Sequence, residues 1–84
     1  MKLRRDDLKQ IVLDAITASG GSASIVDVAK RIWHDHEADL QTSGDLFYTW
    51  QYDMRWAATR LRDEGKLANA DRSPKGIWEL HPDE

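Results

Sequence analysis

The sequence predicts a mainly α-helical domain that ends in a small β-hairpin. Three stretches of the 84-residue chain carry apolar side chains at spacings of three and four, which is the repeat of an amphipathic helix. Glycines separate or end these stretches. A fourth apolar stretch, residues 77–80, shows partial alternation behind a turn that contains Pro74 and Gly76. We therefore expect three helices and a two-stranded hairpin around one core at about residues 5–80.

Length and composition favour a single soluble domain over residues 1–84. The chain has 40% hydrophobic and 32% charged residues, which is typical of a folded protein, and its length accommodates one core. No stretch reaches the roughly 18 consecutive apolar residues of a membrane-spanning helix. The first seven residues have no apolar signal-peptide core. Because there is no cysteine, disulfides and thiolate zinc sites are excluded, and we expect a cytoplasmic protein.

The first helix is expected at about residues 5–19. Asp6 and Asp7 lie in its first turn, where negative charge meets the positive end of the helix dipole. Gly20 and Gly21 end it. Its apolar stripe consists of Leu8, Ile11, Val12, Ala15 and Ile16.

The second helix is expected to begin after Ser24. Asp27 follows this serine by three residues, which resembles a capping box with Asp in place of Glu or Gln. Residues 34–39 are polar throughout, and turn-forming residues follow them up to Asp45. We therefore expect a loop over residues 34–45. The apolar face of the helix consists of Ile25, Val28, Ala29, Ile32 and Trp33.

The third helix is expected to be the longest, from Leu46 to the glycine at position 65. Asp45 or Ser43 is its expected N-cap, and Arg60 and Arg62 lie near its C-terminal end, where cations are favoured. Its apolar face consists of Leu46, Phe47, Trp50, Met54, Ala57, Ala58 and Leu61.

The hairpin is expected to pair residues 66–69 with residues 77–80, and residues 81–84 are expected to form a frayed tail. Three helices followed by a two-stranded wing, with a glycine turn between the first two helices, is the order of a winged helix-turn-helix domain. The fold class is therefore mainly α with a small β-hairpin.

Three segments carry a resemblance to a known family. They are Arg55-Trp56-Ala57, residues 61–67 (LRDEGKL) and residues 75–80 (KGIWEL). Together they resemble the N-terminal winged helix of Mrr-type restriction endonucleases, and the resemblance covers roughly residues 7–80. The cleavage chemistry of that family lies in a separate nuclease domain, which these residues do not contain. The resemblance therefore implies DNA contact by a bacterial or phage regulator, and no enzymatic activity.

The polar face of the third helix is the expected reading surface. Gln pairs with adenine and Arg with guanine in the major groove, while Tyr and Thr hydroxyls reach phosphates. Gln51, Tyr52 and Arg55 are the expected base readers, and acids at positions 45 and 53 would repel phosphate if they faced it. The alternative is an ordinary solvated helix face. The face consists of Tyr48, Thr49, Gln51, Tyr52, Arg55, Thr59 and Arg62.

Two further groups of cations flank this helix in the expected fold. Arg4 and Arg5, with Lys2 and Lys9 nearby, are expected to anchor the DNA backbone from the start of the first helix. The alternative is a solubilising terminus, because acids alternate with these cations. The expected wing contacts are Arg72, Ser73 and Lys75, for which a polar hairpin tip is the alternative.

The charge balance opposes DNA binding and sustains a second hypothesis. The net charge is −3, whereas nucleic-acid modules are commonly basic, and residues 21–45 carry two basic and five acidic side chains. The alternative function is a protein-interaction winged helix that docks a partner through Trp56, Tyr48, Tyr52 and the acidic residues 35–45. Useful DNA specificity would need a homodimer or a larger partner, because one domain offers a single reading helix.

Other kinds of site are not expected. Trp33, Trp50 and Trp78 lie on apolar stripes and are assigned to the core, which leaves Trp56 to pack on the hairpin or anchor a partner. Residues 34–37 (HDHE) are adjacent rather than three or four apart, so they do not form a metal site. We find no catalytic serine and no pocket for an acid–base pair. No cofactor or small-molecule ligand is expected.

Overall fold

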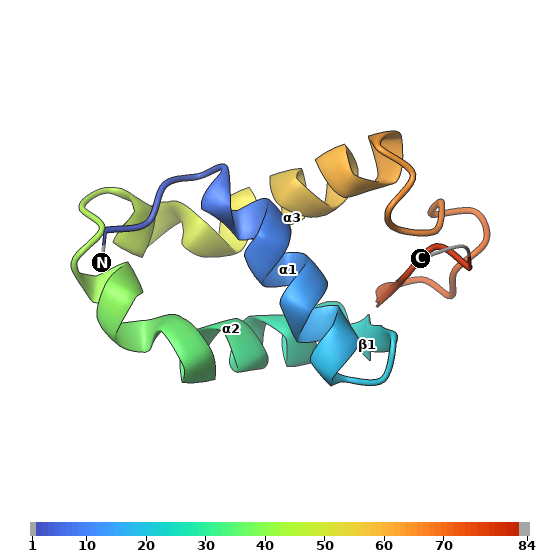
Figure 1. The fold of residues 1–84 in the computed structure, drawn as a ribbon, viewed down its shortest axis with the longest axis horizontal. Coiled ribbons are helices and arrows are strands. Elements are labelled where there is room, and N and C mark those ends of the chain that lie inside the picture. Colours follow the sequence, from blue (N-terminus) through green and yellow to red (C-terminus); the bar gives the residue numbers. More distant parts are fainter. Residues whose placement is uncertain (1, 83–84) are drawn as a thin grey trace.

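The computed structural model describes residues 2–82 as three helices and a two-stranded antiparallel sheet (Figure 1). The elements are α1 (Asp7–Ala18), β1 (Ser22–Ser24), α2 (Ile25–Gln41), α3 (Leu46–Asp63) and β2 (Ile77–Glu79). A helix-rich fold with a small sheet is therefore confirmed. None of the helices in the described range is long and apolar enough to cross a membrane.

The sheet has a different partner strand from the expected one. β2 pairs with β1, in the register Ser22 with Glu79 and Ser24 with Ile77. The expected partner, residues 66–69, contributes only a bridge between Leu67 and Leu80, on the other edge of β2. β1 precedes a helix cap in the sequence and is three residues long, so no alternation marks it as a strand.

The expected loop over residues 34–45 is wrong, because α2 continues to Gln41. His36 has non-helical dihedral angles (φ −128°), so the helix bends there. After the bend, Leu40 is 0% exposed and joins the core. This single buried side chain anchors the last turn of a segment that is otherwise polar apart from Ala38. The Thr42 hydroxyl donates to carbonyls of that turn.

The caps are partly as expected. Ser24 caps α2, since its hydroxyl accepts a hydrogen bond from the Asp27 amide at 3.0 Å. Asp45 occupies the N-cap position of α3 but makes no side-chain cap bond within the described residues. Ser43 does not cap α3: its buried hydroxyl accepts from the Leu3 amide at 2.8 Å and donates to the Asp39 carbonyl. Ser43 thereby ties the N-terminal segment to the turn before α3.

The core lies between α1 and the pair of helices α2 and α3, and β2 closes it with Trp78. In Figure 1, α1 crosses both longer helices, while the chain after α3 runs past the C-terminal end of that helix. Trp33 and Phe47, expected in the core, are only half-buried. Residues 81–84 were expected to form a frayed tail. The backbone amide of His81 instead donates a hydrogen bond to the Lys66 carbonyl, and residues 83–84 lie outside the described residues. Core side chains that the periodicity did not identify are Leu3, Leu40, Leu67 and Ala68.

Candidate nucleic-acid interface

One face of α3 is exposed, polar and free of acidic side chains over its first three turns. Tyr48 and Tyr52 are 83% and 75% exposed, which is unusual for large aromatic side chains. Gln51 and Arg55 are exposed beside them. These four residues follow the three- and four-residue spacing of a helix, so they form one continuous stripe. We call Tyr48, Gln51, Tyr52 and Arg55 the α3 stripe.

Thr49 and Arg5, two of the expected DNA contacts, lie together on the flank of α3 and are engaged with other groups. The Thr49 hydroxyl donates to the Asp53 carboxylate at 2.7 Å. Arg5 lies 3.7 Å from that same carboxylate, and its guanidinium stands 3.7 Å above the ring of Trp56. Asp53 is thus directed at Arg5 and Thr49 rather than at the stripe, and Trp56 has one face covered by a cation.

Of the remaining cations at the start of α1, Lys9 is ion-paired and Arg4 is exposed. Lys9 forms an ion pair with Glu64 just after α3, and this hydrogen bond lowers the pKa of Glu64 from its ordinary value of 4.5. Arg4 is exposed, and its backbone amide donates to the Asp7 carboxylate at 2.8 Å. Of this group, Arg5 and Lys9 are therefore already partly neutralised by acids on or beside α3.

At the C-terminal end of α3, Arg62 and the loop before β2 form a hollow of about 330 Å³. Ser73 and Lys75, both expected contacts, line it together with Arg62. The Nε atom of Arg62 and the Oγ atom of Ser73 are buried and have no hydrogen-bond partner within residues 2–82. We call this the Arg62 hollow, and its full lining is Ile25, Arg62, Ala70, Ser73, Pro74, Lys75, Gly76, Ile77 and Trp78.

Arg72 does not share the Arg62 hollow. It lines a separate hollow of about 200 Å³ with Ala68, Glu79, Leu80 and Pro82. The cations of the loop thus serve two different surfaces, and the one beside Arg72 includes the carboxylate of Glu79.

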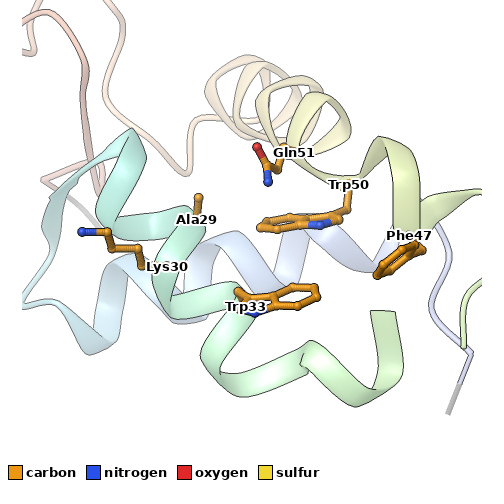
Figure 2. Close-up of a pocket in the computed structure, with 6 residues that line it drawn as sticks. All are labelled: Ala29, Lys30, Trp33, Phe47, Trp50 and Gln51. Carbon is orange, nitrogen blue, oxygen red and sulfur yellow. The ribbon is translucent and has the colours of Figure 1, made fainter. Parts of the chain in front are cut away.

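An apolar groove of about 430 Å³ lies between α2 and α3 (Figure 2). The Trp33 and Trp50 rings face each other across it, nearly parallel at 12° with centroids 6.0 Å apart. Phe47 closes one end, and Gln51 reaches the rim from the α3 stripe. The sequence assigned these aromatic residues to the core. Trp50 is buried there, whereas Trp33 and Phe47 are only half-buried.

The polar segment in the middle of α2 is an ion-paired surface. Asp35 accepts hydrogen bonds from Arg31 at 2.8 Å and pairs with the His34 ring at 2.9 Å. The bond with His34, followed by the one from Arg31, lowers the pKa of the Asp35 carboxyl below its ordinary value. Within residues 2–82 no group of three His, Asp or Glu side chains is arranged to hold a metal ion.

Comparisons of the chain with protein-family models, with curated proteins and with solved structures find no match.

Sequence reasoning missed the Arg62 hollow as a unit. Its polar members come from α3 and from a loop about ten residues later, and its apolar wall includes the first residue of α2. No local pattern joins these positions. The sequence did show cations near the end of the third helix and a polar loop shortly after it, which is the pattern that could have indicated this site.

Proposed function

We propose that this protein is a winged helix-turn-helix module that binds duplex DNA, with α3 as its reading helix, and that it acts as a small regulator. The order of elements supports the fold. β2 lies between β1 and the bridge at Leu67, so residues 69–76 form one loop that projects beyond the end of α3, in the position of a wing (Figure 1).

The observation that carries the proposal is the α3 stripe. A major groove about 12 Å wide admits a helix, and side chains near the helix N-terminus reach the base edges. Gln51 and Arg55 are one turn apart in the middle turns of α3, with amide and guanidinium groups suited to adenine and guanine. Tyr48 and Tyr52, which are also one turn apart, add exposed hydroxyl groups for phosphate contacts.

The flanking charges are compatible with this orientation. Asp53 faces Arg5 and Thr49, which keeps its carboxylate off the stripe. The Arg62 hollow, at the C-terminal end of the same helix, adds two more cations, Arg62 and Lys75. The acidic stretch on α2 is partly compensated by Arg31 and lies on a different helix.

Binding of a random-sequence duplex of about 25 base pairs, about two and a half helical turns, tests the proposal by fluorescence anisotropy. We expect binding at low salt that weakens steeply as salt is raised, because released counterions drive phosphate contacts. Arg55→Ala should weaken binding by about tenfold at low salt, since it removes a cation from the face that meets the duplex.

Arg60→Ala is the matched control for this experiment. Arg60 is an exposed arginine on the same helix, but it pairs with Asp63 and lies away from the stripe. We expect Arg60→Ala to bind nearly as well as the wild type. Equal losses in both variants, or no binding at low salt, would contradict the proposal.

The second candidate is a protein-interaction module, and one specific observation favours it. The Trp33–Trp50 groove and the exposed Tyr48 and Tyr52 place aromatic surface on neighbouring parts of α2 and α3, and aromatic residues anchor protein partners. The net charge of −3 is consistent with it. If DNA does not bind, affinity capture of protein partners on the immobilised wild type should be compared with capture on Tyr52→Ala. Loss of a partner in the variant would support this candidate.

A further inference from the structure

The Arg62 hollow combines positive charge with polar atoms that lack partners. Arg62 and Lys75 both line it, and none of its lining residues within 2–82 is acidic. By contrast, Arg31, Arg60 and Lys9 each have an acidic partner. Within residues 2–82, the hollow therefore presents two cationic side chains, and its own lining holds no carboxylate that neutralises them.

The two unpartnered atoms give the hollow its hydrogen-bonding preference. Buried polar groups in folded proteins are nearly always hydrogen-bonded, because an unmade bond costs free energy. The Nε–H group of Arg62 is only a donor, so it requires an acceptor. The Ser73 hydroxyl is able to donate as well. Both atoms are closed off from solvent in this structure, so a ligand that brings acceptor oxygens would satisfy them once the Arg62 and Ser73 side chains turn toward the hollow.

The shape and the walls of the hollow narrow the class of ligand. Ile25 and Trp78 form apolar walls that exclude part of the water, which strengthens hydrogen bonds to charged groups. Guanidinium groups match the oxygens of phosphate, and a lysine beside them adds a point charge. A carboxylate has only two acceptor oxygens. A phosphate group has more, and therefore suits a site with three donor side chains, Arg62, Ser73 and Lys75, better.

We propose that the Arg62 hollow binds one phosphate group through the Arg62 guanidinium, the Ser73 hydroxyl and the Lys75 ammonium, and that the Arg62 and Ser73 side chains turn their buried polar atoms toward the hollow when it binds. The group is either a phosphodiester of bound duplex DNA or a free phosphate. Where it belongs to DNA, the inference rests on the proposed function, and the contact fixes the position of the loop relative to α3.

Backbone-amide NMR on the full chain tests the site with two separate probes. Inorganic phosphate is titrated against sodium chloride at equal ionic strength, and the duplex of about 25 base pairs is titrated in parallel. We expect both probes to shift the amides of Arg62, Ser73 and residues 75–77 and the indole N–H signal of Trp78, whereas chloride leaves them in place. Arg62→Gln should weaken phosphate binding by about tenfold, because it removes a charge-assisted hydrogen bond.

Two further variants keep the test independent of folding. Arg60→Gln removes the same charge from the same helix outside the hollow and should bind phosphate like the wild type. Ser73→Ala lies in the loop and removes only the unpartnered hydroxyl, so it should keep the fold, as measured by circular dichroism, and weaken phosphate binding several-fold.

The outcomes separate this site from the proposed function. Phosphate shifts at the hollow without any response to duplex DNA would support the site with free phosphate as its ligand, while the DNA proposal would fail. Responses to duplex at residues 48–55 alone, with no phosphate effect beyond that of chloride, would overturn the site and leave the DNA proposal standing. Equal weakening by Arg62→Gln and Arg60→Gln would also overturn the site, since it indicates general charge screening.

Discussion

At the scale of single residues, Arg5 shows how a cation is diverted from a ligand-binding role. Its guanidinium is 3.7 Å from the Trp56 ring centroid and 3.7 Å from the Asp53 carboxylate. Both partners are on α3, so Arg5 joins the start of α1 to the middle of that helix. The sequence suggested that Arg5 anchors DNA and that Trp56 packs on the hairpin or binds a partner, whereas the structure pairs the two residues with each other.

Arg5→Ala should lower the free energy of unfolding by about 0.5–1 kcal/mol, which is typical of an exposed cation–π contact. The ion pair adds little, because Arg5 is half exposed and such pairs are screened by solvent. Urea denaturation followed by circular dichroism measures the effect. Arg4→Ala is the control, because Arg4 is the neighbouring residue and its side chain is exposed. We expect it to change the free energy of unfolding by no more than about 0.5 kcal/mol. Equal changes in the two variants would show that the Trp56 contact contributes nothing specific.

At the scale of elements, the last turn of α2 depends on one apolar side chain. Residues 34–39 are polar, and the backbone leaves the helical region at His36. Leu40 is completely buried nonetheless, and Ser43 just beyond it binds the Leu3 amide. The turn is therefore held by tertiary contacts, since its own sequence has little helical pattern.

Leu40→Ala should destabilise the protein by about 2–5 kcal/mol, the range for removing a buried leucine side chain from a core. Gln41→Ala changes the neighbouring exposed residue and should alter stability by less than about 0.5 kcal/mol. Thermal and urea denaturation of both variants measures the difference. A Leu40→Ala protein as stable as Gln41→Ala would contradict the anchoring role and favour a detached segment after His36.

At the scale of the whole molecule, the distribution of charge matters more than the net value of −3. Residues 21–45, which include all of α2, account for an excess of three acidic side chains. The α3 stripe and the Arg62 hollow have no acidic member within the described residues. A chain with negative net charge thus keeps two surfaces whose own members include no carboxylate.

The salt dependence of DNA binding should report how many cations engage. On a random-sequence duplex, where Arg55 meets phosphate in place of a target base, Arg55, the Arg62 hollow and Arg72 are taken to neutralise about one phosphate each. This predicts a slope of about −3 in a plot of log K against log salt. Arg5 and Lys9 do not add to it, because acids on or beside α3 already hold them. Anisotropy titrations at four or more salt concentrations give the slope. A slope of about −5 or steeper would mean that cations at the start of α1 also bind DNA.

The sequence by itself determined the features that depend on neighbouring residues. The spans of α1 and α3, the start of α2 at Ser24 and the polar face of α3 follow from apolar spacing and from a serine cap, which act within a few residues of each other. The exposure of Gln51, Tyr52 and Arg55 follows in the same way, since burying one side of a helix leaves the opposite side in solvent. Their role in DNA binding remains a prediction.

Only the tertiary structure decided which distant residues meet. It paired β2 with β1 instead of residues 66–69, extended α2 to the buried Leu40, and turned Ser43 from a helix cap into a tie for Leu3. It also joined Arg62 to the loop that precedes β2. Each of these contacts depends on residues that are distant in the sequence or on packing against other elements. Such contacts leave no periodic pattern along the chain.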